Sequence, residues 1–200
     1  MQKKPQKKRS GFLPGFSPKH FAFHPEETTT QLLEKVILVD EKDKPIGEGE
    51  KMRVHREGKL HRSFSIFIFN SRGETLLQQR AQEKYHSGGL WSNACCGHPR
   101  PGEDTLQAAR RRLQEEMGLD CELKELLQFT YKVKLDHDLW EHEFDHVFLG
   151  IYDGEVYPNP QEADGYDWVD QKTLLEEVRR YPDQYTAWFK IVLDRVLAAW

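Results

Sequence analysis

One strongly periodic segment constrains the fold of this chain more than any other feature. Thr105–Met117 carries apolar side chains at helical spacing, at Leu106, Ala109, Leu113 and Met117. Gly118 follows directly, and glycine is the residue that most often ends a helix. The segment therefore predicts a helix that stops at Gly118.

Shorter segments of β type surround this helix. They lie at residues 34–40, 63–70, 75–80, near 126–135 and near 143–152. The 63–70 segment alternates and is dense in Phe and Ile, so it predicts a well-buried strand, and the turn at 71–73 joins it to the next in a hairpin. Residues from about 171 to the end predict two further helices, broken near Tyr181 and Pro182. Strands mixed with helices predict an α/β sandwich.

Length and charge bound the remaining possibilities. Two hundred residues predict one domain, and a net charge of −4 argues against a general nucleic-acid binder. No apolar run approaches the roughly 18 residues of a membrane span. Three cysteines (Cys95, Cys96 and Cys121) form no disulfide framework and fit a reducing compartment, so we expect a cytoplasmic protein. The basic N-terminus lacks the apolar core of a signal peptide, so we expect a flexible tail at 1–30 and a single domain at 31–200.

The helix and the loop before it match a spaced motif. Gly97 is followed after five residues by Glu103 and, seven residues later, by RRLQEEMGL from Arg111 to Leu119. This resembles the Nudix box, G-x5-E-x7-R-E-U-x-E-E-x-G-U, with U a bulky aliphatic residue. The resemblance implies an α/β fold: a Nudix-type sandwich of mixed β-sheet between α-helices, with additional C-terminal helices. It also implies that carboxylates of the loop–helix unit hold a divalent cation against a diphosphate.

One position departs from the box, because Arg112 stands where the pattern has Glu. Nudix hydrolases use a cluster of box carboxylates to hold the metals that activate water, so a cation here disfavours hydrolysis and favours a phosphate contact. The alternative is helix electrostatics, since Arg111 with Glu115 and Arg112 with Glu116 are spaced for i,i+4 ion pairs. Both interpretations stay open for the first pair, whereas the motif favours function for the second.

The loop that enters the box carries a second motif, WSNACCGHP, from Trp91 to Pro99. It is similar to the W-[ST]-N-x-x-C-[GS]-H-P segment of type I isopentenyl-diphosphate isomerases, in which the cysteine is catalytic and the histidine binds metal. The resemblance implies that Cys96 is catalytic and that His98 is a metal ligand. Cys95 is expected to be a passive, inert neighbour.

Two more segments resemble the same family. It has two metal-binding histidines just before the buried strand, and His55 and His61 match them; in isolation such histidines are usually surface residues. It also has an E-x-E pair on the metal, matched by Glu141 and Glu143. Residues two apart in a strand project to one face and can reach one ion together, although an acidic run is also typical of a solvated edge strand.

The resemblance therefore implies two metal sites. Five nitrogen and oxygen ligands exceed the four of structural zinc and fit Mn²⁺ or Mg²⁺, with Zn²⁺ as a further candidate. At the second site Mg²⁺ bridges Glu116 and the substrate diphosphate. His142 and His146 match no ligand position, so they are expected at the surface.

Basic and aromatic residues complete the implied site. Four match the family's diphosphate contacts: Lys51, Arg80, Lys84 and Arg112. Tyr131 and Trp188 match pocket positions, and Trp91 is a further candidate for the wall that shelters a cation. Individually, the cations are typical of ordinary surface residues and the aromatics of core packing.

The implied reaction interconverts isopentenyl diphosphate and dimethylallyl diphosphate, in isoprenoid biosynthesis, through a tertiary carbocation. Cys96 and Glu143 form the proton-transferring pair on opposite faces of the alkene, with Tyr131 assisting Glu143. Two rivals stay open: a Nudix diphosphohydrolase, which leaves Cys96 without purpose, and an inactive Nudix module, which would be expected to lose metal ligands. We expect a small-molecule substrate, no nucleic-acid or membrane partner, and a monomer or weak dimer.

Overall fold

The computed structural model describes residues 34–199, so the tail expected at 1–30 lies outside the described residues. These residues form one nine-stranded sheet and its covering helices. The strands are β1 (Lys35–Val39), β2 (Pro45–Glu50), β3 (His61–Phe69), β4 (Glu74–Arg80), β5 (Trp91–Asn93), β6 (Cys95–Gly97), β7 (Leu123–Lys134), β8 (Trp140–Ile151) and β9 (Ala163–Asp170). The helices are α2 (Lys51–Glu57), α3 (Thr105–Met117), α4 (Gln171–Arg180), the 3-10 helix η1 (Pro182–Gln184) and α5 (Ala187–Ala199). None of the helices described is long and apolar enough to cross a membrane.

Strand β3 organises the sheet, because every one of its residues except Arg62 is buried. It runs parallel to β8 along its whole length, from the pair His61–Glu143 to the pair Phe69–Ile151. Its other neighbours, β1, β4 and β6, are antiparallel. The sheet is therefore mixed, as predicted.

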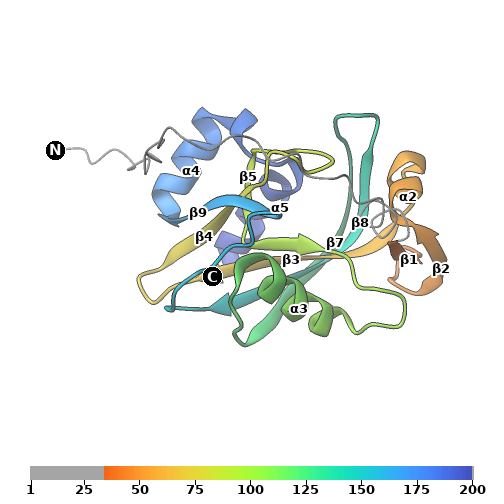
Figure 1. The fold of residues 1–200 in the computed structure, drawn as a ribbon, viewed down its shortest axis with the longest axis horizontal. Coiled ribbons are helices and arrows are strands. Elements are labelled where there is room, and N and C mark those ends of the chain that lie inside the picture. The colour runs from red at the N-terminus through yellow and green to blue at the C-terminus, as the bar shows by residue number, and fades with distance from the viewer. Residues whose placement is uncertain (1–33, 200) are drawn as a thin grey trace, which may run out of the picture.

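Alternate side chains of β3 fill two separate cores, one on each face of the sheet. Phe64 and Ile66 pack with Leu113 of α3 on one face. Phe67 packs with Phe189 of α5 on the other, their rings 6.0 Å apart and stacked. Figure 1 shows α3 and α5 on opposite sides of the strands. The predicted sandwich is confirmed, including the C-terminal helices and the break after Arg180.

The helix α3 has the predicted length and stop. Asp104 accepts a hydrogen bond from the backbone N–H of Gln107 at its start, and Gly118 ends it with φ 66°. That left-handed conformation is the one that glycine adopts without steric cost.

The sequence patterns missed the helix α2, the strand β9 and the short strands β5 and β6, which lie where a loop was expected. The seven residues of α2 are too few to reveal a period, and a local signal, Glu50 accepting hydrogen bonds from Met52 and Arg53 N–H, sets its start instead. Only one residue of β9 is buried, and the strand forms because its backbone pairs with β4 from Glu74 to Arg80. Partners distant in sequence determine such strands, so local composition does not show them.

Candidate active site

Five side chains predicted as metal ligands converge at one end of the sheet. One nitrogen or oxygen atom from each lies within 4.8 Å of the others, and four of the five residues are buried. They are His55 of α2, His61 of β3, His98 after β6, and Glu141 and Glu143 of β8. Segments far apart in the sequence therefore build one centre, which we call the His/Glu cluster.

Sheet register explains this convergence. His61 and Glu143 are direct partners in the parallel pairing of β3 with β8. Glu141 lies two residues before Glu143 and so projects to the same face. Strand β6 pairs with β3 through Phe64 and Gly97, which brings the next residue, His98, to the same strand end.

The backbone fixes two of the imidazoles. His55 Nδ1 lies 2.7 Å from the carbonyl oxygen of Lys51, and His61 Nδ1 lies 2.9 Å from that of Lys59. A carbonyl oxygen only accepts, so in the neutral rings Nδ1 carries the proton and Nε2 keeps its lone pair. His61 Nε2 lies 3.2 Å from His98 Nε2, which in turn is 2.9 Å from Glu143 Oε1. Lone pairs and carboxylate oxygens thus face one another, which is the donor set of a divalent cation.

Two atoms of the His/Glu cluster are buried without a hydrogen-bond partner. Among residues 34–199, the buried side-chain nitrogen and oxygen atoms without a hydrogen-bond partner are His55 Nε2, Glu141 Oε2, Arg80 Nε and Thr75 Oγ1. The first two lie 3.3 Å apart without hydrogen-bond geometry. Because an unpaired buried polar atom costs roughly 1–3 kcal/mol, three such atoms on predicted site residues indicate a place built for a ligand.

Two acidic residues of this face of β8, Glu143 and Asp145, differ in charge. Burial raises the pKa of Glu143, but His61 and His98 outweigh burial and hold it well below its usual range. Burial, followed by the charge of Glu143, raises the pKa of Asp145 to about 8. Burial lowers the pKa of His98 to about 4, against the opposing effect of Glu143. The site therefore contains a charged Glu143 beside a protonated Asp145, a division typical of catalytic carboxylates.

Tyr131 and Cys96 extend the site along this face. The hydroxyl of Tyr131 donates to Glu143 Oε2 at 2.5 Å. Asp145 accepts from Ser65 Oγ at 2.8 Å, and Ser65 Oγ lies 3.6 Å from Cys96 Sγ. A chain of polar contacts therefore connects the thiol with the acidic residues of β8.

The two adjacent thiols point to opposite faces of the sheet. Cys95 is fully buried in the core on the α3 side, whereas Cys96 packs against the core on the α5 side. Asn93 orients Cys96: its Nδ2 donates to two backbone carbonyls, and its Oδ1 accepts from Cys96 Sγ at 3.1 Å. Burial, followed by the charge of Asp145, raises the pKa of Cys96 to about 12. Cys96 is thus a protonated thiol on the face of the His/Glu cluster, and Cys95 lies outside that face, as expected.

The four predicted diphosphate contacts differ in how their charged groups are paired. Lys51 begins α2, one turn before His55, and pairs with Glu34 at 2.9 Å. Lys84 pairs with Glu162, which also accepts from Arg112 at 2.9 Å. Arg80 is buried; its NH2 donates to the carbonyl of His86, and its Nε has no partner.

The ion pairs of α3 are both formed. Arg111 lies 3.2 Å from Glu115 and 2.7 Å from Glu103. Arg112 lies 2.5 Å from Glu116, whose other oxygen accepts from Gln78 at 2.9 Å. The predicted phosphate contact and second metal ligand are therefore hydrogen-bonded neighbours, and each oxygen of Glu116 accepts one hydrogen bond.

Aromatic rings border the site. Trp188 is buried, donates from Nε1 to Ser92 Oγ at 3.0 Å, and has the Arg80 guanidinium 5.2 Å from its ring centre. Tyr131 stacks on Phe129, and Trp91 is half-buried beside the same core. For each ring, these contacts agree both with ordinary core packing and with a place in the wall of a substrate pocket.

Sequence patterns missed four polar residues of this region: Asn93, Asp145, His86 and Glu162. Asn93 stands within the motif from Trp91 to Pro99 and could have been found there. The others acquire their roles from neighbours distant in sequence.

The prediction for His146 was wrong, because this residue is buried rather than at the surface. Its Nε2 lies 3.0 Å from Asp43, and its Nδ1 lies 2.6 Å from Glu125. The turn after β1 supplies Asp43 and so covers a face of β8 that would otherwise be exposed. His142 is half-buried, with Nδ1 2.8 Å from the carbonyl of Gly58.

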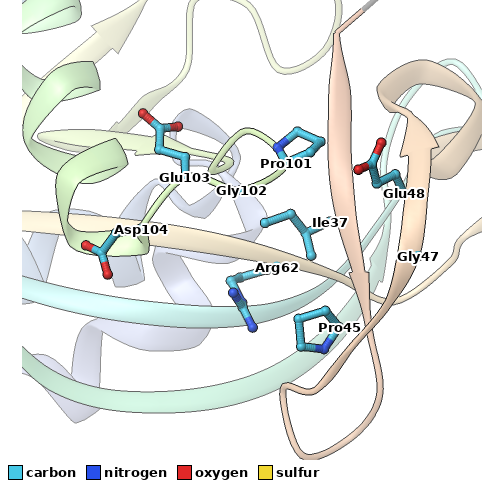
Figure 2. A pocket seen from close by; sticks show the side chains of 9 residues that line it. All are labelled: Ile37, Pro45, Gly47, Glu48, Arg62, Pro101, Gly102, Glu103 and Asp104. Atoms are coloured by element: carbon cyan, nitrogen blue, oxygen red, sulfur yellow. The ribbon is translucent and has the colours of Figure 1, made fainter.

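A surface pocket of about 500 Å³ lies between the β1–β2 hairpin and the loop before α3 (Figure 2). It is lined by Ile37, Pro45, Gly47, Glu48, Arg62, Pro101, Gly102, Glu103 and Asp104. Arg62 is paired with Asp43 and Glu103 with Arg111, each at 2.7 Å. Asp104 caps α3. The pocket contains no predicted site residue.

Comparisons with known proteins agree with this geometry. The model of the NUDIX domain matches residues 59–189. The chain is 54% identical over 165 residues to isopentenyl-diphosphate Delta-isomerase 2 of Aromatoleum aromaticum, a match that covers 82% of this chain and 87% of that protein. It is also 54% identical to the isopentenyl-diphosphate Delta-isomerase of Serratia proteamaculans, over 80% of this chain and 89% of that one.

Solved structures agree on the fold alone. A protein from Deinococcus radiodurans has a TM-score of 0.63 at 22% identity and covers 74% of this chain and 90% of its own. A MutT NUDIX hydrolase from Burkholderia pseudomallei has a TM-score of 0.54 at 21% identity, over 69% and 98% of the two chains. With the family match over residues 59–189 and the half-identical relatives, this chain belongs to the NUDIX family and, within it, to the isopentenyl-diphosphate Delta-isomerases.

Proposed function

We propose that this protein interconverts isopentenyl diphosphate and dimethylallyl diphosphate, as the names of its half-identical relatives indicate. The observation that carries the proposal is the buried His/Glu cluster, which lies on the same sheet face as a protonated thiol. A double-bond shift needs one proton added and one removed, and these groups supply both functions.

The cluster donors favour Mn²⁺ or Mg²⁺, with Zn²⁺ as a further candidate, because mixed imidazole and carboxylate ligands at high coordination suit these ions. A bound divalent cation would supply positive charge against the two buried carboxylates. Glu116 would hold a second ion, Mg²⁺, at the diphosphate. Its burial and its contact with Arg112 support that role, since a cation and a carboxylate side by side can receive a phosphate and its metal together.

Cys96 and Glu143 are the proposed catalytic residues. The thiol is held protonated by burial, so it can give a proton to the terminal methylene carbon. Glu143 is charged, so it can accept the proton that leaves the allylic carbon, while Tyr131 orients its Oε2. The electrons of the broken C–H bond form the new double bond. The reaction is reversible, so each group acts in both directions.

Burial and charge prepare the surroundings for a tertiary carbocation. Trp188 and Tyr131 are buried, and an aromatic face contributes on the order of 0.5–2 kcal/mol to a desolvated cation. The diphosphate would be bound by Lys51, Arg80, Lys84 and Arg112. The structural support is strongest for Arg80. Its guanidinium is buried and its Nε has no hydrogen-bond partner, and a bound diphosphate would supply one.

Arg112 and the thiol favour isomerisation over hydrolysis. A hydrolase needs box carboxylates to activate water, and Arg112 replaces one of them with a cation. A hydrolase would also have no use for a buried thiol oriented by Asn93.

We further propose a cytoplasmic location, since a working thiol needs a reducing compartment. One chain supplies every proposed ligand, which is consistent with a monomer or weak dimer.

One assay tests the proposal. Purified protein is incubated with isopentenyl diphosphate and Mg²⁺, and both dimethylallyl diphosphate and free phosphate are measured. We expect the isomer without phosphate. Phosphate alone would establish a hydrolase, and neither product would establish an inactive module.

A further inference from the structure

We propose that His86 is a positioning residue of the metal centre, which fixes the carboxylate of Glu141 and joins it to the aromatic wall. The loop between β4 and β5 supplies His86, and no motif pointed to it. The inference rests on the proposed function only through the presence of a metal ion at the His/Glu cluster.

His86 lies against the cluster without being part of it. It is 4% exposed, and its Nε2 lies 3.2 Å from Glu141 Oε1. The other oxygen of Glu141, Oε2, lies 3.3 Å from His55 Nε2. The two oxygens of one carboxylate therefore face two imidazoles. Only His55 belongs to the five residues whose ligand atoms lie within 4.8 Å of one another, so His86 acts through Glu141.

The contact made by the second ring nitrogen of His86 determines which nitrogen carries the proton, and so whether His86 can donate to Glu141. Its Nδ1 lies 3.3 Å from the hydroxyl oxygen of Ser87. When that hydroxyl donates to Nδ1, the proton of the neutral ring is on Nε2 and faces a carboxylate that only accepts. A ligand carboxylate held in this way keeps one orientation, and removing such a partner typically weakens metal binding.

The same residue touches the proposed substrate pocket. Its ring stands edge-on to Trp188, with centres 5.5 Å apart and planes at 88°. Its backbone carbonyl accepts from Arg80 NH2 at 3.2 Å, and Arg80 lies over the Trp188 ring. His86 therefore contacts a metal-ligand candidate, an aromatic wall and a diphosphate contact at once.

The loop holds His86 in a defined conformation. Ser87 has φ 51°, a left-handed value that is uncommon outside glycine. Gly88 has no room for a side chain, because a Cβ there would lie 2.3 Å from the carbonyl oxygen of Gln82. Gly89 N–H donates to the carbonyl of Arg80 at 3.0 Å and closes the loop. These three features constrain the backbone of the loop that carries His86.

Two substitutions separate the roles of the ring. His86→Phe keeps an aromatic ring against Trp188 and removes the N–H, whereas His86→Gln keeps an N–H donor and removes the ring. The metal-free proteins are titrated with Mn²⁺ by calorimetry, without substrate. We expect His86→Phe to weaken Mn²⁺ binding by about 10- to 100-fold, and His86→Gln to stay within about threefold of the unmodified protein.

A matched control comes from the opposite face of β8. His146 is a buried histidine between two carboxylates, so His146→Phe removes the same kind of contact and should leave the Kd for Mn²⁺ unchanged. The thermal melt of each metal-free variant shows that it is folded; if His86→Phe gives no cooperative melt, His86→Met replaces it as the donor-free variant.

The results distinguish the two proposals. An unchanged Kd in the donor-free variant overturns the role of His86 and leaves the metal centre intact. Equal weakening in the donor-free and Gln variants also overturns it, because the ring rather than the N–H would then matter. Failure of the unmodified protein to bind Mn²⁺ or Zn²⁺ would instead overturn the proposed metal centre.

Discussion

Two clusters of histidine and carboxylate side chains lie on opposite faces of β8, and they differ in how their polar atoms are paired. In the His/Glu cluster, His55 Nε2 and Glu141 Oε2 are buried without a hydrogen-bond partner. In the second, which we call the His146 cluster (Asp43, Arg62, Glu125 and His146), both ring nitrogens face carboxylates, and Asp43 also accepts from Arg62 at 2.7 Å. One strand thus carries two chemically similar groups of residues.

This difference distinguishes a buried polar cluster that binds a ligand from one that stabilises the fold. A fully paired network stabilises the fold and has no capacity left for a ligand. Converging lone pairs without partners lower stability, and they persist where a ligand completes them. Each prediction below changes one cluster and uses the other, or its nearest counterpart, as the reference.

The largest effect is expected for the carboxylate of Glu143. Glu143→Gln has the same shape but cannot accept a proton or bring a charge to the metal, so isomerisation should fall by about 10⁴-fold, the upper range for loss of a general base. Glu125→Gln in the His146 cluster should keep kcat within about twofold. Initial rates of dimethylallyl diphosphate formation measure both. A Glu143→Gln variant with a tenth of normal activity would contradict the proposed role.

The adjacent thiols allow the same comparison across the sheet. Cys96→Ala should lower kcat by about 10³-fold through loss of the second proton-transferring group. Cys95→Ala removes a sulfur from the core on the α3 side, so it should cost about 1 kcal/mol of unfolding free energy and keep most activity. Chemical denaturation and turnover are measured on both variants, together with metal content. Near-normal turnover by Cys96→Ala would refute its role.

How much of the fold could be predicted from the sequence depends on how far apart in the chain the interacting residues lie. The helix α3 and the β3–β4 hairpin follow from neighbours in the chain, so their patterns were sufficient. The strand β9 forms because β4 pairs with it, which no local pattern reveals. The site residues were predicted by resemblance, and the structure brings the five proposed ligands within 4.8 Å of one another.

The errors have the same origin. Alternation in β8 correctly placed Glu141 and Glu143 on one face. His146, on the opposite face, was expected at the surface only because it matched no ligand position of the family. Asp43, about a hundred residues earlier in the chain, covers that face and buries His146. His86 was missed for a related reason, since its partner Glu141 lies on a strand formed much later in the sequence.

Metal binding should stabilise the folded protein through the His/Glu cluster alone. At a Mn²⁺ concentration about 100 times the Kd, linkage adds about 2.7 kcal/mol to the unfolding free energy. For a protein of this size, the thermal midpoint should then rise by about 5–10 °C and fall again on chelation. His61→Ala should abolish the rise, whereas His146→Ala, with a lower starting midpoint, should retain it. An equal rise of the thermal midpoint in His61→Ala would show that the metal binds outside the His/Glu cluster.

The smallest effect is expected in the His146 cluster itself. Asp43→Asn removes the charge that faces both His146 and Arg62, and because Asp43 is partly exposed, the loss should be only about 1 kcal/mol of unfolding free energy. Denaturant titration at low and high salt measures it, and added salt should reduce the difference. Both kcat and the Kd for Mn²⁺ should stay unchanged, since the His146 cluster and the His/Glu cluster occupy opposite faces of β8. A change in either would mean that β8 transmits strain between its faces, and the separation of a structural from a binding cluster would fail.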